Sequence, residues 1–306
     1  MHTLKIAWLI SLWILAQGCA TASSLPVKEV AAGVYLHQGA HEDFDENYHG
    51  DIANIGFIVG KEAVAVIDTG GYIKTGMALR EAIRAVTDLP IRYVINTHIH
   101  PDHIFGNAAF HADKPTYVGH HKLPAAMQQR ADGYLNSLRN QFGKEAEGSI
   151  IMPPTLLVED VATLDLGGRR LELKAWSTAH TNNDLSVLDT ATSTLWLSDL
   201  LFIERTPSID GDIKGWLRVI EKIRAIDARL VVPGHGQVTS DKNAALDNQR
   251  RYLQTLLDDV QASIRKGVSM TDTMNTAAQS EKNAWALFES TNRRNVNIVY
   301  PGLEWE

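Results

Sequence analysis

Residues 97–103 read Thr-His-Ile-His-Pro-Asp-His, which places three imidazoles and one carboxylate within seven consecutive residues. The stretch directly follows an apolar run, Ile91–Asn96, that is typical of a buried strand in an α/β domain. Loops that follow such strands commonly carry functional residues. Imidazole and carboxylate are ligands that zinc and similar divalent ions accept. The stretch therefore predicts a metal site at the end of a strand.

The spacing inside this stretch favours two metal positions over one. His98 and His100 alternate along the chain, so both side chains can face the same side of an extended segment. Asp102 and His103 follow the bend expected at Pro101 and can point to a second position nearby. The geometry therefore suits two neighbouring metal ions.

Composition and charge exclude several classes of protein. The chain has 306 residues, of which 44% are hydrophobic and 21% are charged, and this is ordinary for a globular protein with a sizeable core. A net charge of −7 argues against a general partner of nucleic acid or of anionic membranes. We therefore expect a small-molecule substrate and no nucleic acid.

The N-terminus has the order of a secretory signal. Lys5 precedes the apolar stretch Ile6–Ala16, and small residues follow at 18–22. We predict a signal peptide at residues 1–22 and a mature chain that begins near Ser23, in the periplasm or outside the cell. The apolar stretch is too short to span a bilayer comfortably, so no span is expected in the mature form. The alternatives are a retained membrane anchor and a lipid anchor at Cys19, because Gly18-Cys19 resembles the end of a lipobox.

The remaining pattern predicts an α/β fold with helices packed outside a sheet sandwich. Strands are expected at 34–37, 55–59, 63–67, 91–96, 155–158, 171–176, 185–188, 194–197 and 230–232. Helices are expected at 73–87, 121–147 and 215–226 and from about 240 onward. Residues 23–306 are therefore predicted to form one domain with a helical C-terminal extension at about 240–306.

Further candidate ligands stand at the ends of predicted strands. His180, Asp199 and His235 each follow an apolar run and lie in a turn with small residues, and Asp68 has the same setting. Taken singly, such a residue is more often a loop or capping residue. In combination with the 97–103 cluster they favour ligation, because metal sites recruit ligands from several loops.

The motifs Asp68, His98-x-His100-x-Asp102-His103, His180, Asp199 and Pro233-Gly234-His235-Gly236 together resemble the metallo-β-lactamase superfamily of binuclear hydrolases. The resemblance covers about residues 30–240 and implies a metallo-β-lactamase-like αββα sandwich with the metals at one edge of the sheets. It implies one metal on His98, His100 and His180, a second on Asp102, His103 and His235, and Asp199 as a bridge. Asp68 would orient a histidine ligand or the metal-bound water, and Asp68 and Asp102 are the predicted catalytic carboxylates.

Two divalent ions about 3.5–4 Å apart can share a hydroxide that is a strong nucleophile at neutral pH. Such a site requires no serine or cysteine nucleophile. We therefore expect a hydrolase with two Zn²⁺ ions, with iron or manganese as alternatives because these ligand types do not determine the metal. The expected substrate is a small ester-, lactone-, thioester- or amide-like molecule.

Asp199 separates this chain from one group of relatives. Zinc lactamases that it resembles at His180 usually have cysteine, or serine with a different ligand set, at the position of Asp199. Those with cysteine carry a lysine three residues later that holds the substrate carboxylate, whereas this chain has Phe202. Aspartate there is typical of thioesterase, lactonase and phosphodiesterase members. β-Lactam hydrolysis is therefore kept as an alternative function.

Other segments carry a second resemblance. The loop 37–42, the run Asn54–Gly60 and the terminal stretch Arg294–Tyr300 resemble the quinoprotein relay system zinc metallohydrolases, which are periplasmic relatives of a metallohydrolase found with sulfur-oxidation systems. This resemblance implies a link to a periplasmic quinoprotein system. A non-catalytic, metal-dependent accessory protein of such a quinoprotein is the remaining alternative.

The acidic segment 41–47 is predicted to be a solvated flap. If it covered the metals, its charge would disfavour strongly anionic substrates. His120 and His121, where a strand meets a helix, are predicted to be a surface pair.

Overall fold

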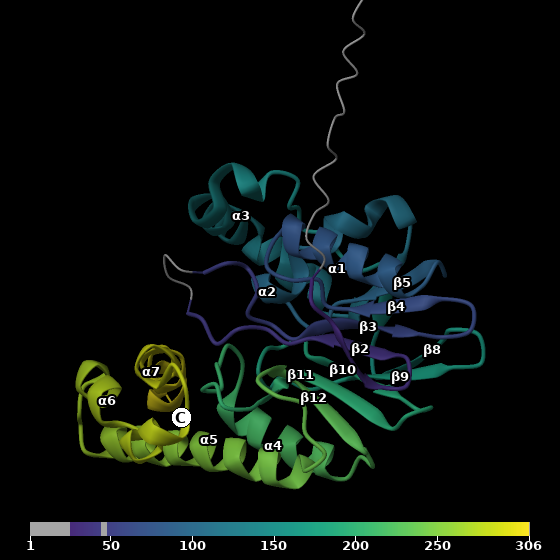
Figure 1. Ribbon diagram of the computed structural model, residues 1–306. Coiled ribbons are helices and arrows are strands. Elements are labelled where there is room, and N and C mark those ends of the chain that lie inside the picture. Colours follow the sequence, from purple (N-terminus) through teal and green to yellow (C-terminus); the bar gives the residue numbers. More distant parts are fainter. Residues whose placement is uncertain (1–24, 44–47, 306) are drawn as a thin grey trace, which may run out of the picture.

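Two β-sheets pack face to face, and helices cover their outer faces (Figure 1). The computed structural model describes residues 25–43 and 48–305. This is the predicted αββα sandwich. The predicted signal peptide and Cys19 lie outside the described residues. Among the helices that are described, none combines the length and the apolar character needed to cross a membrane.

The first sheet contains the N-terminal strands and is mixed. Its strand order is β1-β2-β3-β4-β5-β6-β7, with antiparallel pairing from β1 to β4 and parallel pairing from β4 to β7. The strands are β1 (Lys28–Ala31), β2 (Val34–His37), β3 (Ile55–Val59), β4 (Val64–Ile67), β5 (Ile91–Ile95), β6 (Thr116–His120) and β7 (Leu156–Val158). Because β4 and β5 are parallel, the loops that follow them begin at the same edge of the sheet.

The second sheet is mainly antiparallel and has the order β12-β11-β10-β9-β8, with one parallel pair, β11 and β12. The strands are β8 (Val161–Asp165), β9 (Arg170–Ala175), β10 (Leu185–Asp189), β11 (Thr194–Phe202) and β12 (Leu230–His235). The parallel pairing brings the carboxyl ends of β11 and β12 to one edge.

Helices enclose the two sheets. They are α1 (Ile73–Val86), α2 (Pro101–Ile104), α3 (Leu123–Phe142), α4 (Ile213–Arg224), α5 (Lys242–Arg265), α6 (Met270–Thr276) and α7 (Phe288–Glu304), with short 3₁₀ helices at Asn107–Asp113, Gly143–Ala146 and Gln279–Ala284. Figure 1 shows α1 on the outer side of the first sheet and α4 and α5 on the outer side of the second. α4 begins after Asp212, whose carboxylate accepts hydrogen bonds from the backbone N–H groups of Lys214 and Gly215.

The apolar side chains form three layers that match this architecture. Residues such as Ile58, Leu173 and Trp196 are buried between the two sheets. Leu79 of α1 packs against the other face of the first sheet. Trp216 of α4 belongs to a third cluster, which joins the second sheet to α4, α5 and α7. The C-terminal helices are thereby held to the body of the protein by a continuous core.

Most predicted elements are confirmed to within a few residues, but two strands were missed. β1 and β8 lie at the edges of their sheets and are partly exposed, so their apolar pattern is weak. β6 was predicted only as the strand that meets a helix at His120, without its bounds. β11 extends past the predicted end at Leu197 and is buried along its whole length.

β11 is irregular where it reaches the sheet edge. Its register with β12 shifts on both sides of Ser198, a residue with φ of 48°. This bulge directs Asp199 toward the neighbouring strand. A Cβ atom on Gly234 of β12 would lie 1.8 Å from Asp199 Oδ1, so only glycine allows this close approach.

Asn54 ties the two sheets together beside β3. It is fully buried, and its side-chain amide donates hydrogen bonds of 2.8 Å to the carbonyls of Pro233 and Gly236. Its side-chain oxygen accepts from the Gly39 N–H at 3.1 Å. The end of β12, which contains His235, is therefore held against the first sheet by the Asn54 side chain, beside the bond of 2.8 Å from the Asn54 N–H to the Gly234 carbonyl.

We predict that Asn54→Ala lowers the free energy of unfolding by about 2–4 kcal/mol, because it leaves buried carbonyl and amide groups without partners. Urea denaturation followed by circular dichroism measures this loss. Asn140→Ala, at an exposed position of α3, is the control and should change the value by less than about 0.5 kcal/mol. Equal effects of the two substitutions would contradict the assigned role of Asn54.

Candidate metal centre

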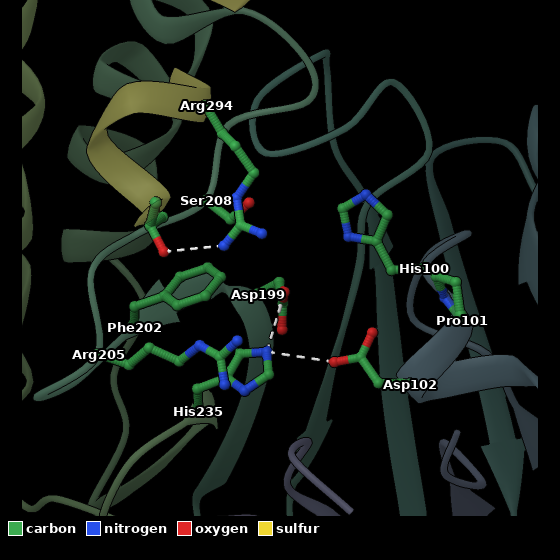
Figure 2. A pocket seen from close by; sticks show the side chains of 10 residues that line it. His100, Pro101, Asp102, Asp199, Phe202, Arg205, Ser208, His235 and Arg294 are labelled. Atoms are coloured by element: carbon green, nitrogen blue, oxygen red, sulfur yellow. Dashed lines mark hydrogen bonds and ion pairs between the residues drawn. The ribbon is translucent and has the colours of Figure 1, made fainter. Parts of the chain in front are cut away.

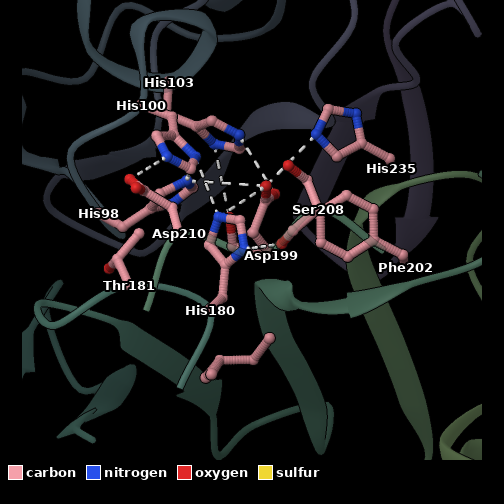
Figure 3. A network of polar contacts seen from close by, with 12 residues as sticks. His98, His100, His103, His180, Thr181, Asp199, Phe202, Ser208, Asp210 and His235 are labelled. Carbon is pink, nitrogen blue, oxygen red and sulfur yellow. Dashed lines mark hydrogen bonds and ion pairs between the residues drawn. The ribbon is translucent and has the colours of Figure 1, made fainter. Parts of the chain in front are cut away.

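The structure brings all seven predicted ligands together at one edge of the sandwich. Figure 3 labels each of them except Asp102. They form one group of His98, His100, His180 and Asp199 and a second group of Asp102, His103 and His235, and in each group the candidate ligand atoms lie within 4.8 Å of one another. The first sheet contributes the residues that follow β5. The second sheet contributes the β9–β10 loop and the strands β11 and β12.

In the first group, three ring nitrogens converge on one point. His100 Nδ1 is 3.1 Å from His98 Nε2 and 3.0 Å from His180 Nε2. Asp199 Oδ2 lies 3.3 Å from His180 Nε2 and 3.7 Å from His98 Nε2. The four side chains thus surround a common space.

The other nitrogens of these rings are held by outer partners. His180 Nδ1 donates to the Ser208 carbonyl at 2.6 Å, and His100 Nε2 donates to the Asp210 carboxylate at 2.9 Å. His98 Nδ1 is 3.0 Å from the Thr97 hydroxyl. A neutral ring whose proton faces outward presents a lone pair inward. Lone pairs about 3 Å apart repel one another, and a bound cation removes that repulsion.

The second group contains buried polar atoms without hydrogen bonds. Among the described residues, His103 Nε2 and Asp199 Oδ1 are buried and lack a hydrogen-bond partner, although they are only 3.2 Å apart. Asp102 Oδ2 lies 3.5 Å from both His103 Nε2 and His235 Nε2. Buried polar atoms left unsatisfied are costly unless a ligand completes them. The donor set therefore fits a second divalent ion.

Asp199 of the first group also lies beside the second, since its Oδ1 is 3.2 Å from His103 Nε2 and its Oδ2 is 3.4 Å from His235 Nε2. A carboxylate between two cations would lower their mutual repulsion. His235 is oriented toward this centre because its Nδ1 donates to the Ile52 carbonyl at 2.7 Å. The sequence resemblance implies a bridging role for Asp199 at this place, and that role stays a prediction.

Asp68 lies behind the ligands. Its carboxylate is fully buried and accepts hydrogen bonds from His103 Nδ1 at 2.8 Å and from the Thr97 N–H at 2.9 Å. Its backbone is in the left-handed region, with φ of 55°, which is uncommon for aspartate. The contact directs His103 Nε2 into the centre, as expected for a residue that orients a histidine ligand.

Electrostatics keep two of the imidazoles neutral. Burial lowers the pKa of His180 to about 4 and lowers the pKa of His98 well below its usual value. A neutral imidazole is the form that binds a metal. These two rings therefore require no deprotonation near neutral pH before they can ligate.

His103 behaves in the opposite way. Burial lowers its pKa, but the nearby carboxylates of Asp199, Asp102 and Asp68 outweigh this effect and raise the pKa well above its usual value. Without a metal, a proton on His103 partly balances these carboxylates. Metal binding at this position must therefore release a proton.

Asp210 and Arg130 were not predicted. Asp210 Oδ2 accepts hydrogen bonds from His100 Nε2 at 2.9 Å and from Arg130 Nη1 at 2.5 Å. Burial raises the pKa of Asp210, but its bonds to His100 and Arg130 lower it by more, so it stays ionised. Arg130 belongs to α3, so the polar helix predicted at 121–147 supports a candidate ligand. Nothing in the local sequence distinguishes Asp210 from an ordinary loop aspartate.

A pocket opens onto the metal centre, and two arginines line it (Figure 2). Arg205 follows β11, and Arg294 reaches the pocket from α7. Phe202 and Ser208 also line this pocket. The sequence at Phe202 indicated that a substrate-binding cation is missing, but the fold brings two cations from other positions. Arg294 was noticed only as part of a terminal resemblance.

The acidic loop differs from the predicted solvated flap in its described part, residues 41–43. His41 Nε2 lies 3.1 Å from Glu204, and the Glu42 carbonyl accepts a hydrogen bond of 2.9 Å from Arg205. Asp43 pairs with Arg294 at 3.0 Å. These residues are therefore engaged with the pocket wall. Residues 44–47 lie outside the described part of the chain.

His120 also differs from the sequence prediction of a surface pair. It is buried, its Nε2 lies 3.2 Å from the Trp176 carbonyl, and its Nδ1 accepts from the Lys122 N–H at 3.0 Å. Burial lowers its pKa to about 4. It is a core histidine outside the metal centre.

Comparison with known proteins places the chain in a family. The model of the metallo-beta-lactamase superfamily matches residues 49–235, which contain all seven candidate ligands. The chain therefore belongs to the metallo-beta-lactamase superfamily, whose members are metal-dependent hydrolases. The narrower resemblance to quinoprotein-linked metallohydrolases stays a prediction.

Individual relatives cover the chain unevenly. A linear primary-alkylsulfatase from a Pseudomonas species is 31% identical over 68 residues, which are 22% of this chain and 13% of that enzyme. The chain thus matches only a small part of that relative's length.

Solved structures show the same fold. A metallo-beta-lactamase from Pontibacter korlensis aligns with a TM-score of 0.61 and 21% identity, over 76% of this chain and 99% of that one. A stereoselective inverting sec-alkylsulfatase from a Pseudomonas species aligns with a TM-score of 0.68 and 18% identity, over 90% of this chain and 50% of that one. At these identities the likeness concerns the fold alone.

We predict that the purified protein binds about two divalent ions per chain and that Asp199→Ala reduces this number to one or fewer, because both groups lose a carboxylate oxygen. Elemental analysis after dialysis measures the content. Asp160→Ala, which removes an exposed carboxylate paired with Lys174, is the control. Unchanged metal content in the Asp199 variant would contradict a shared position.

We further predict that Asp210→Asn weakens metal affinity by about 10–100-fold, because the amide orients His100 less firmly than the carboxylate does. Competition with a chromophoric chelator measures the affinity. A loss seen equally in Asp160→Ala would show that the effect is not specific to His100.

Proposed function

We propose that this protein is a binuclear zinc hydrolase of small ester-, lactone-, thioester- or amide-like molecules. The observation that carries the proposal is the position of Asp199, which lies between two groups of candidate ligands at the base of an open pocket. One shared carboxylate and neutral imidazoles form a donor set that suits zinc, with iron or manganese as alternatives.

Bound at these positions, two divalent ions supply an activated water at neutral pH and polarise the oxygen of the scissile group. The residues of the chain hold the donor atoms in place for this chemistry. Asp68 keeps His103 Nε2 turned inward, and Asp210 does the same for His100 Nδ1. Asp102, a candidate ligand at the pocket wall, is also placed to accept a proton from the attacking water.

Sulfate esters are a second candidate substrate class. Two alkylsulfatases are among the relatives, and the sec-alkylsulfatase aligns with 90% of this chain, against 76% for the lactamase from Pontibacter korlensis. Positive charge in the pocket, from Arg205 and Arg294, also suits a sulfate group. In such a substrate the scissile group itself carries the negative charge.

β-Lactam hydrolysis is retained as an alternative because lactamases share the fold. The aspartate at 199 and the absence of a lysine at 202 disfavour it. A non-catalytic accessory role for a periplasmic quinoprotein is the other alternative. A binding protein would have no need for two groups of inward-facing donor atoms at an open pocket.

We also propose that the protein is exported and acts with a periplasmic quinoprotein system. The order of charged, apolar and small residues in 1–22 supports export, either with cleavage near Ser23 or with lipid attachment at Cys19. N-terminal sequencing of the protein from fractionated cells distinguishes these forms. A cytoplasmic protein that retains Met1 would contradict the proposal.

We predict that the zinc-loaded protein hydrolyses at least one member of a panel of chromogenic esters, lactones, thioesters and amides, and that Asp199→Ala abolishes this turnover. Initial rates with matched metal content measure the activity. The panel also contains an aryl sulfate, an alkyl sulfate, a phosphodiester and nitrocefin.

The pattern of activity decides among the candidates. Turnover of sulfate esters alone would replace the first substrate class with the second, and turnover of nitrocefin alone would favour a lactamase. A protein with full metal content that turns over none of these compounds would favour the accessory role.

A further inference from the structure

Arg205 is a buried cation in the pocket at the metal centre, and few neighbouring groups offset its charge by direct contact. Arg205 is 5% exposed to solvent, and its guanidinium donates one hydrogen bond of 2.9 Å to the Glu42 carbonyl. In the described part of the chain no carboxylate lies within 4.0 Å of its guanidinium. A buried charge is costly unless it is paired, and in the described part of the chain the Glu42 carbonyl is the one direct side-chain partner of Arg205. An anion that enters the pocket would supply a paired charge.

Two carboxylates of the metal centre act on Arg205 from a distance. Burial lowers the pKa of Arg205, whereas Asp102 and Asp199 raise it. Both carboxylates belong to the candidate ligand groups. Two divalent ions would neutralise them, and the charge of Arg205 would then add to an excess of positive charge in the pocket. The loaded pocket therefore favours an anion.

Arg294 provides a second guanidinium from a different element. It lies on α7, its side chain is half exposed, and it bonds to Asp43 at 3.0 Å and to the Thr291 hydroxyl at 3.3 Å. Figure 2 shows Arg205 and Arg294 on the same side of the pocket, facing Asp199. The bond to Asp43 demonstrates that a carboxylate can reach Arg294 at this position.

A groove of mixed character adjoins this pocket, with Arg130, Asp210 and Arg293 among its lining residues. His100, Ser208 and Arg294 line both the metal pocket and a neighbouring groove. The groove adds Met274 of α6 and Ile298 of α7, and Ile298 is 43% exposed. An apolar side chain this exposed beside a polar pocket offers a surface for the hydrocarbon part of a ligand.

We propose that Arg205 and Arg294 form an oxyanion-binding subsite that selects substrates carrying a carboxylate or sulfate group next to an apolar body. Guanidinium groups bind both kinds of oxyanion through paired N–H donors. The proposal rests on the proposed hydrolase function and names its substrate class. It also bears on the expectation from the acidic loop. In the described part of that loop, the Glu42 carbonyl bonds to Arg205 and the Asp43 carboxylate bonds to Arg294.

Binding of unreactive ligands tests this subsite apart from turnover. The ligands are octanoate, octane sulfonate and octanol, which share a chain and differ in the head group, and calorimetry is performed on the zinc-loaded protein. We expect both anions to bind about tenfold or more tightly than octanol. Tighter binding of octanoate than of the sulfonate assigns the subsite to carboxylates, and the reverse order assigns it to sulfate groups.

Variants separate the arginines from the metals as the source of this affinity. Arg205→Met should weaken anion binding by about tenfold and leave octanol binding unchanged, with metal content equal to that of the wild type. Arg294→Met should cause a smaller loss, because Asp43 already engages that side chain. Arg250→Met removes an arginine paired with Glu221 on the protein surface and is the matched control.

The outcome with these variants decides the proposal. Anion affinity that is unchanged in both Arg205→Met and Arg294→Met would overturn it, because the anions would then be bound by the metals alone. If Arg205→Met does not fold, Arg294→Met on the exposed side of α7 still decides the question. Arginine-dependent binding in a protein that hydrolyses no ester would support the subsite and reject the hydrolase function.

Discussion

The buried carboxylate of Asp199 is the constraint on which this structure depends. It lies 3.2–3.7 Å from ring nitrogens of His98, His103, His180 and His235, and it is almost fully excluded from solvent. A carboxylate in such surroundings is stable only beside positive charge. The bulge in β11 and the glycine at 234 exist at the one place where the strand must present this group. The irregular end of β11 and the candidate metal centre therefore depend on the same residues.

The C-terminal helices extend this centre into a pocket. The core around Trp216 holds α7 against α4 and α5, and α7 in turn places Arg294 at the mouth of the site. In the function that we propose, bound metals would determine which bonds can be attacked, whereas Arg205, Arg294 and the groove beside α7 would select which molecules approach. The candidate ligands lie at the edge of the two sheets, and the proposed oxyanion subsite lies between β11 and α7.

The sequence allowed good prediction where the signal was local. The candidate ligands at 98–103 are close in the chain, and His180, Asp199 and His235 each follow a recognisable apolar run. Asp210, Arg130 and Arg205 carried no such signal, because a charged loop or helix residue is normally solvated. Their importance comes from contacts with His100, Glu42 and the metal pocket, which are distant in sequence. The edge strands β1 and β8 were missed because partial exposure weakens their periodicity.

The sequence by itself determined the fold class, the candidate ligands and the hydrolytic chemistry that they suit. Strand periodicity and the spacing of metal ligands are properties of short segments, so they can be recognised in the sequence. Only the tertiary structure decided which side chains orient the ligands, such as Asp210 on His100, and which cations line the pocket. Those properties depend on side chains that meet across two sheets and a C-terminal helix. The distances between such side chains are determined by how the sheets and helices pack, and a short stretch of sequence does not predict them.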